Sequence, residues 1–106
     1  MTYFLDVVLP IPIERLFTYA LTRQQATHIV PGMRIAVPFG KSKIYTALSI
    51  RVHQNPPTAY EAKEIHEVLD DYAMVNPIQL KHWHWVATYY MCTLGEVVRG
   101  ALPSAL

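Results

Sequence analysis

Apolar residues recur at every second position in short segments that are separated by turn residues. In TYFLDVVL, residues 2–9, apolar residues occupy both odd-numbered and even-numbered positions, which predicts a strand covered on two faces. Alternation or β-branched and aromatic enrichment predicts four further strands, at 16–21, 33–39, 43–52 and 64–70, with a helical turn as the alternative for the last. Pro10 and Pro12 disfavour a helix between the first two. The pattern indicates a mainly β domain.

The segments around these strands carry finer expectations. In residues 43–52 strict alternation places the even-numbered residues from Ile44 to Val52 on one face, and the odd-numbered ones, continuing to His53, on the other. The polar stretch at 22–30 predicts no definite element, and Pro31 and Gly32 mark a turn. Asp70 and Asp71, the adjacent carboxylates, are interpreted as a solvated turn after the last strand.

The period changes after Asn76. Asn76 can cap a helix, Pro77 suits its first position, and Gln79 completes a capping box. A second box, Thr93 with Glu96, predicts a short helix that ends near Gly100 and Pro103. Two apolar stripes follow the helical period, one of Trp83, Val86, Ala87, Tyr90, Met91 and Leu94 and one of His82, Trp85 and Tyr89. The predicted fold class is α+β, mainly β: a twisted antiparallel sheet curled toward a small barrel, closed by a C-terminal helix pair.

Composition narrows the class of protein. A chain of 106 residues with 52% hydrophobic content suits one domain, 1–106. Only 16% of residues are charged, and the ending ALPSAL is apolar, so we expect a piece of a larger protein. A net charge of +1 argues against a broad DNA-binding basic face. One cysteine, and no apolar run long enough for a membrane span, favour a cytoplasmic location.

The stretch AVPFGKSK at 36–43 ends like a nucleotide-binding P-loop. A P-loop requires a glycine five positions before Gly40, where this chain has Ile35, and it must open into a helix, whereas a strand is predicted here. The P-loop interpretation fails, and a strand–turn–strand connection remains.

The histidines and the cysteine do not predict a reactive site. On a helix His82 and His84 differ by about 200° of rotation, and Cys92 lies about 12 Å along the axis from His84. Because no pair has the spacing of metal ligands and Cys92 has no evident activating base, we expect no metal, no cofactor and no catalytic residue.

Four separated blocks resemble the N-terminal domain of the PriA family, the bacterial primosomal helicases: VVLPIPIERLFTYAL, PGMRIAVPFGKSK, KEIHEVLD and ATYYMCTLGEVVRGALP. They cover nearly the whole chain in the family's order. The resemblance implies a domain that binds the 3′-terminal nucleotide of single-stranded DNA and orients a replication-restart helicase on arrested forks. The fragment itself would be no enzyme, while the parent chain would be an ATP-dependent 3′-to-5′ DNA helicase.

The same resemblance implies the site. The family's nucleotide pocket falls on Phe17, Thr18, Gly40 and Lys63, with Lys41 and Lys43 as auxiliary phosphate contacts. Phe17 would form an apolar wall, Gly40 would allow close backbone approach, and Lys63 would pair with a phosphate. Members of the family carry an aspartate at the position of Thr18, which puts selectivity for a 3′ hydroxyl in question. Thr18 also points opposite to Phe17 in a regular strand.

A second interpretation stays open. The low charge fits equally a protein-interaction module that docks the helicase core of the same chain or another primosome or replication protein. The two interpretations differ at Phe17 and Lys63, which end binding requires and partner docking does not.

Overall fold

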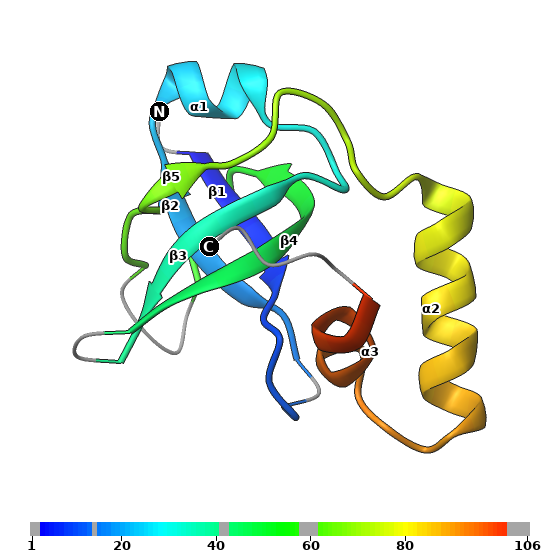
Figure 1. Ribbon diagram of the computed structural model, residues 1–106. Coiled ribbons are helices and arrows are strands. Elements are labelled where there is room, and N and C mark those ends of the chain that lie inside the picture. Colours follow the sequence, from blue (N-terminus) through cyan, green and yellow to red (C-terminus); the bar gives the residue numbers. More distant parts are fainter. Residues whose placement is uncertain (1–2, 14, 41–42, 58–61, 102–106) are drawn as a thin grey trace.

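A five-stranded antiparallel sheet and three helices make up the computed structural model, which describes residues 3–13, 15–40, 43–57 and 62–101. The strands are β1 (Tyr3–Val8), β2 (Phe17–Leu21), β3 (Arg34–Phe39), β4 (Lys43–His53) and β5 (Glu67–Val68). They lie in the order β2-β1-β4-β3-β5 (Figure 1). The helices are α1 (Arg23–His28), α2 (Pro77–Tyr89) and α3 (Leu94–Ala101). The predicted α+β class and antiparallel pairing are confirmed.

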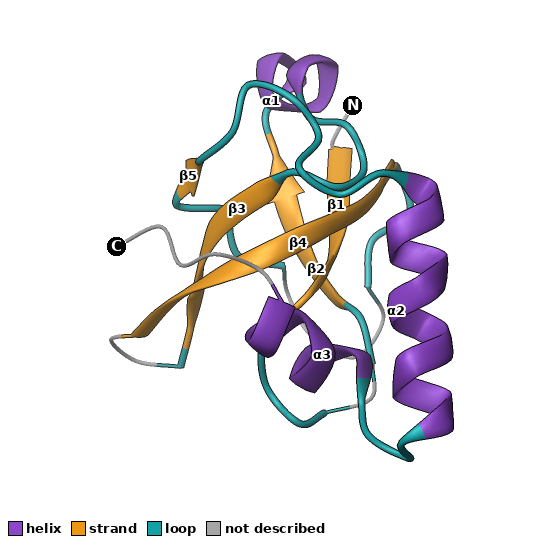
Figure 2. Cartoon of the chain, turned by 45° about the vertical axis from the view of Figure 1, so that its right-hand side comes forward, coloured by secondary structure: helices purple, strands orange, loops and turns teal. Residues whose placement is uncertain are grey.

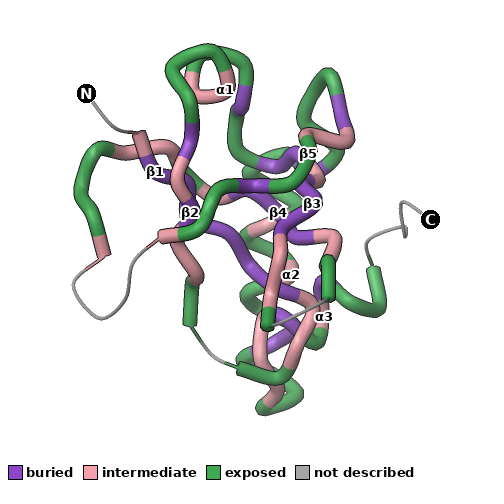
Figure 3. The backbone as a smooth tube through the Cα atoms, turned by 90° about the vertical axis from the view of Figure 1, so that its left-hand side faces the viewer, coloured by how far each residue is buried: buried purple, intermediate pink, exposed green. Residues whose placement is uncertain are grey.

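The sheet buries apolar side chains on both faces, as the pattern in β1 predicts. Leu5 and Val7 belong to the larger core, whereas Val8 packs with Leu48 and Val98 in a smaller core beneath α3. The buried residues of the larger core are Leu5, Val7, Leu9, Tyr19, Leu21, Ile29, Met33, Ile35, Val37, Ala47 and Ile65. Figure 3 shows this burial concentrated along the central strands.

The predicted face assignment of β4 is wrong beyond residue 50, because the strand contains a β-bulge. Asp6 pairs with Arg51 while the next residue, Val7, pairs with Ser49, so Ile50 is an extra residue. The extra residue reverses the alternation. Leu48 therefore faces the smaller core, whereas Val52 packs against the larger one.

The predicted curling does not end in a closed barrel among the described residues. β2 and β5 are the outer strands of the sheet. Among the described residues, the segment that precedes β5 is tied to β2 where the Ala20 amide donates to the Lys63 carbonyl at 2.7 Å, beside a parallel bridge from Ala20 to Glu64. The sheet is thus strongly curved but open.

The solvated-turn interpretation of Asp70 is also wrong. Its carboxylate is buried and accepts hydrogen bonds from the Arg34 side chain, the shortest 2.7 Å from Nη2 to Oδ1. It accepts another from the Arg34 backbone amide at 2.9 Å. A buried carboxylate needs such partners, and the arginine is one strand away, beyond the reach of a local pattern.

Both C-terminal helices begin at the predicted capping boxes. The Asn76 side chain accepts from the Gln79 amide at 2.8 Å, and the Thr93 hydroxyl accepts from the Glu96 amide at 3.2 Å. The predicted stripe extends too far, because α2 ends at Tyr89 and Met91 is 93% exposed. The undefined polar stretch contains α1, capped by Thr22.

The helices α2 and α3 lie together to one side of the sheet (Figure 2). Both helices pack on the smaller core, α3 through Val98 and α2 through Leu80 and Trp83, and Gly95 of α3 lies against the chain leading out of β1. That the helix pair closes the sheet stays a prediction. Within the described ranges no helix combines the length and apolar character needed to cross a membrane.

Candidate functional site

A cavity of about 340 Å³ opens between the start of β2, the end of β3 and Lys63. It brings together the four residues that the family resemblance predicts, Phe17, Thr18, Gly40 and Lys63, which come from three separate segments of the sequence. The other residues of the lining are Arg15, Tyr19, Pro38 and Phe39. Of the two predicted auxiliary lysines, Lys43 is exposed and is not in this lining, and Lys41 lies outside the described residues.

One wall of the cavity is aromatic. The rings of Phe17 and Phe39 meet edge to face, with centroids 5.3 Å apart and an interplanar angle of 85°. Tyr45 extends the cluster, 5.8 Å from Phe39. The guanidinium carbon of Arg15 lies 4.9 Å from the Phe17 centroid, within the range of a cation–π contact. This wall therefore offers apolar ring surface beside a fixed positive charge.

Two features set the width of the cavity. The Tyr19 hydroxyl donates to the Pro38 carbonyl at 2.8 Å, which ties β2 to the end of β3. Gly40 follows with φ of 74°, a left-handed conformation that glycine adopts readily. A Cβ built on Gly40 would meet no described atom within 4 Å. The glycine is therefore required by the turn conformation and not by crowding inside the domain.

Lys63 is positioned by its backbone. Its carbonyl accepts from the Ala20 amide at 2.7 Å, which places the residue beside β2 while its side chain stays exposed. A single lysine at the mouth of a small cavity can neutralise one phosphate. Together with Arg15, it supplies the positive charge of this lining.

Thr18 reaches the site from a different direction than Phe17. In the regular pairing of β2 with β1, Phe17 lies opposite Val7 and Thr18 lies opposite Asp6, so their side chains leave on opposite faces. The Thr18 hydroxyl donates to the Asp6 carboxylate at 2.7 Å. Both residues can still line one cavity because β2 is an outer strand and begins at Phe17.

Asp6 is the centre of a polar cluster on that second face. Besides the Thr18 hydroxyl, it accepts from Arg51 Nε and His53 Nε2, each at 2.8 Å. The Asn55 amide donates to His53 Nδ1 at 3.1 Å, which places the ring proton on Nε2 in the neutral imidazole. Burial alone would raise the pKa of the Asp6 carboxyl, but the hydrogen bonds it accepts outweigh that effect and lower the pKa below its ordinary value.

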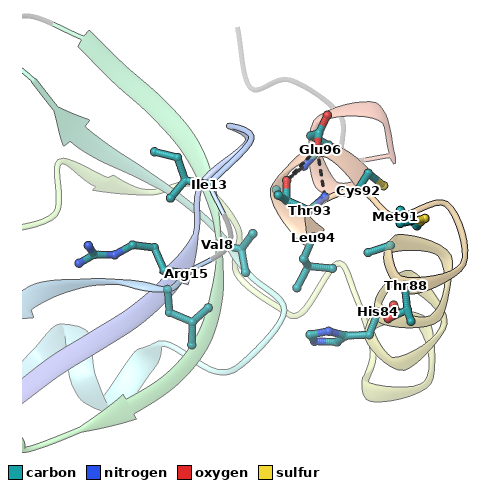
Figure 4. Close-up of a pocket in the computed structure, with 13 residues that line it drawn as sticks. Val8, Ile13, Arg15, His84, Thr88, Met91, Cys92, Thr93, Leu94 and Glu96 are labelled. Atoms are coloured by element: carbon teal, nitrogen blue, oxygen red, sulfur yellow. Dashed lines mark hydrogen bonds between the residues drawn. The ribbon is translucent and has the colours of Figure 1, made fainter.

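A second cavity, of about 560 Å³, separates the β1–β2 connection from the turn between α2 and α3. Figure 4 shows Ile13 and Val8 facing Leu94 and His84 across it, with the guanidinium of Arg15 turned away from the helices. The Glu96 carboxylate is occupied at the α3 cap, where it accepts from the Thr93 amide at 3.0 Å.

The part of the chain that the structure describes contains no group of three or more histidine, cysteine or acidic side chains placed to hold a metal ion.

The sequence interpretation missed half of the first cavity's lining. Tyr19 shares the parity of Phe17, so alternation alone could have placed both on one face. Phe39 directly precedes Gly40 in the VPFG block and could have been included with it. Arg15 precedes the strand, and no local pattern gives its direction.

Comparison with known proteins identifies the family of the chain. The family model described as the 3′DNA-binding domain (3′BD) of PriA matches residues 6–103. Replication restart protein PriA of Haemophilus influenzae is 34% identical over 100 residues, 94% of this chain and 13% of that protein. PriA of Treponema pallidum is 29% identical over 108 residues, 98% of this chain and 16% of that protein. The chain thus spans about one seventh of the length of these relatives, and it belongs to the family of PriA 3′DNA-binding domains.

Proposed function

We propose that the cavity beside β2 binds the 3′-terminal nucleotide of a DNA strand. The observation that carries this proposal is the convergence of Phe17, Thr18, Gly40 and Lys63 on one 340 Å³ cavity, although up to 46 positions separate them in the chain. The volume lies in the range of small-molecule sites. We infer a terminal nucleotide, and not a base flipped out of the interior of a strand, because the chain belongs to a family described as 3′DNA-binding domains.

The lining supports a division of roles. A terminal base would lie against the aromatic wall of Phe17 and Phe39, where stacking contributes about 1 to 3 kcal/mol and tolerates every base. The backbone at Gly40 can approach the nucleotide closely, since glycine itself has no side chain. Lys63 and Arg15 would face phosphate groups. Because few phosphates are neutralised, affinity should be modest and its salt dependence shallow.

At the level of the parent protein, the pocket would orient a PriA-type helicase by holding the end of the nascent strand at an arrested fork. Orientation then comes from one occupied pocket and not from a charged surface, in agreement with the net charge of +1. We propose in addition that the parent protein has helicase activity, contains the ATP site and is cytoplasmic. The domain would contribute recognition and no chemistry.

Fluorescence anisotropy with a short single strand tests the pocket. We expect a 3′-hydroxyl strand to bind more tightly than the same strand with a 3′ phosphate. Phe17→Leu, which keeps apolar volume without the ring, and Lys63→Ala should each weaken binding about 10-fold. Lys81→Ala removes an exposed lysine on α2, outside the cavity lining, and serves as the charge-matched control. Equal binding by Phe17→Leu, Lys63→Ala and the unmodified domain would refute the proposal.

The interaction-module alternative rests on a different surface. Along α2, His82 stacks on Trp85 with centroids 6.0 Å apart, and Trp85 stacks on Tyr89 at 5.1 Å. Trp85 is nevertheless 58% exposed and Tyr89 66% exposed. Large aromatic side chains gathered on a surface are typical of docking sites. We infer that the remainder of the parent chain covers this row.

Hydrogen exchange tests that inference directly. The α2 amides should exchange more slowly in the longer protein than in the isolated domain, and Trp85→Ala with Tyr89→Ala should remove the difference. End binding by the isolated domain should be unchanged in that variant. Identical exchange of α2 in both proteins would refute the docking role and leave the pocket proposal intact.

A further inference from the structure

We propose that Asp6, one strand behind the pocket, sets the selectivity for a 3′ hydroxyl by fixing the hydroxyl of Thr18 as a hydrogen-bond acceptor. This inference rests on the proposed function and names the residue that would read the chemistry of the strand end. Asp6 would act through Thr18 and would not itself touch the nucleotide. It is therefore a positioning residue.

Asp6 and Thr18 lie directly opposite each other in the antiparallel pairing of β1 with β2, so both side chains leave on the same face. Their contact is 2.7 Å from Thr18 Oγ1 to Asp6 Oδ1, the short distance typical of a hydroxyl that donates to a carboxylate. Asp6 is 5% exposed, so its carboxylate is held in place by its surroundings.

The Thr18 hydroxyl can act toward a ligand only as a hydrogen-bond acceptor. A hydroxyl carries a single hydrogen, and Thr18 donates that hydrogen to Asp6. Any further hydrogen bond to Thr18 Oγ1 must therefore be one in which Thr18 accepts. Arg51 and His53, on the neighbouring strand β4, donate to Oδ2 and Oδ1 of the same carboxylate and keep it charged. The negative charge of Asp6 polarises the threonine hydroxyl and makes its oxygen a stronger acceptor.

The 3′ end of a nucleotide bound in the cavity can reach Thr18. Because β2 is an outer strand, a nucleotide whose base lies against Phe17 can extend its sugar over the strand edge toward the face that carries Thr18. A 3′ hydroxyl is a donor and would meet the oriented acceptor. The carboxylate that the family resemblance places at position 18 is thus supplied here from Asp6, with threonine between it and the strand end.

Strands that differ only in the terminal group test the polarity in the unmodified domain. A 3′-fluoro end resembles a 3′ hydroxyl in size but cannot donate, whereas a 3′-amino end can. We expect the hydroxyl and amino strands to bind similarly, and the fluoro strand about 5- to 10-fold more weakly, the usual effect of one lost hydrogen bond to a polarised group. Equal affinity for the hydroxyl and fluoro strands would overturn the inference.

Variants assign the effect to the pair. Thr18→Val should abolish the hydroxyl preference, and Thr18→Ser should keep it. Asp6→Asn should reduce the preference, and the double variant Asp6→Asn with Thr18→Asp should restore it, because the carboxylate then reaches the strand end directly. A role for Asp6 in stability alone would not be rescued by moving the charge. Melting temperatures verify that each variant is folded, and if Asp6→Asn is not, the fluoro comparison in the unmodified domain still decides.

The outcomes separate the two proposals. Weakened binding in Phe17→Leu, together with an unchanged hydroxyl preference in Thr18→Val, would leave the pocket in place and overturn the role of the Asp6–Thr18 pair. Binding that is insensitive to Phe17, Lys63 and the strand end would overturn both.

Discussion

Gly95, at the second position of α3, lies against the backbone of Ile11 in the proline-containing connection between β1 and β2. A Cβ added to Gly95 would stand 2.2 Å from the Ile11 carbonyl oxygen and 2.5 Å from that of Leu9. Neither is the end of a flexible side chain, so the helix or the connection would have to move. The same connection leads directly to Arg15 and Phe17 at the pocket.

We therefore expect Gly95→Ala to lower the free energy of unfolding by about 2 to 3 kcal/mol. Gly100→Ala is the matched control in the same helix, because a Cβ there meets no described atom within 4 Å. That control should gain about 0.5 to 1 kcal/mol from helix propensity. Urea unfolding of both variants measures the difference, and similar stabilities would contradict the close approach.

Met91 should be replaceable with a gain in stability. It has φ of 56° and is 93% exposed, so burial of its side chain does not offset the left-handed conformation. Because glycine adopts this conformation without steric penalty after a helix, Met91→Gly should stabilise the domain by about 1 kcal/mol. Thermal unfolding gives the result, and a lowered melting temperature would mean that the methionine side chain stabilises the fold in another way.

The Arg34–Asp70 pair should make stability depend on pH on the acid side. The hydrogen bonds from Arg34 lower the pKa of the Asp70 carboxyl below its ordinary value. The pair's contribution is thus complete above about pH 4, where the unfolded carboxyl is ionised, and is lost as the pH falls through the lower pKa of the folded state. Asp70→Asn should cost about 2 to 3 kcal/mol at pH 7.

Urea unfolding at several pH values checks this dependence. The stability difference between the unmodified domain and Asp70→Asn should shrink below about pH 4. The variant Asp71→Asn, which changes the exposed neighbouring carboxylate, is the control and should follow the unmodified domain. A difference that stays constant down to pH 2 would show that the charge of Asp70 is not what stabilises the pair.

Gly40 allows pocket function to be separated from stability. Asparagine tolerates a positive φ, and a Cβ at this position meets no described atom within 4 Å, so Gly40→Asn should cost less than about 1 kcal/mol in the unbound domain. If a nucleotide approaches the backbone here, the same variant should weaken 3′-end binding about 10-fold or more. Unfolding and anisotropy on one preparation give both values. Unchanged affinity would show that the nucleotide does not approach Gly40.

The sequence predicts local structure here better than it predicts contacts between distant strands. The Asn76 and Thr93 capping boxes fix their helices because donor and acceptor are three residues apart. The same signal is present in Thr22 and Gln25, which cap α1, and was overlooked within a polar stretch. These features need no knowledge of tertiary structure.

Arg34 with Asp70 and Thr18 with Asp6 could not be predicted in this way. Their partners are 36 and 12 residues apart, and each contact depends on which strands are neighbours in the sheet. The pocket residues are predicted from the family resemblance alone, because nothing local distinguishes Phe17 from a core phenylalanine. Arg15 and Phe39 show the remaining gap, since their positions depend on how the curved sheet brings β2 toward β3.

The single extra residue in β4 has a consequence for how this domain tolerates change in length. Without Ile50, Arg51 and His53 would turn to the opposite face, and Asp6 would keep its buried charge without two of its three side-chain donors. A one-residue deletion at the bulge would therefore disturb the Asp6–Thr18 pair that we propose to recognise the strand end, although every pocket residue would remain in the sequence. Insertions and deletions within residues 43–53 should thus be far less tolerable than equal changes in the loop that follows.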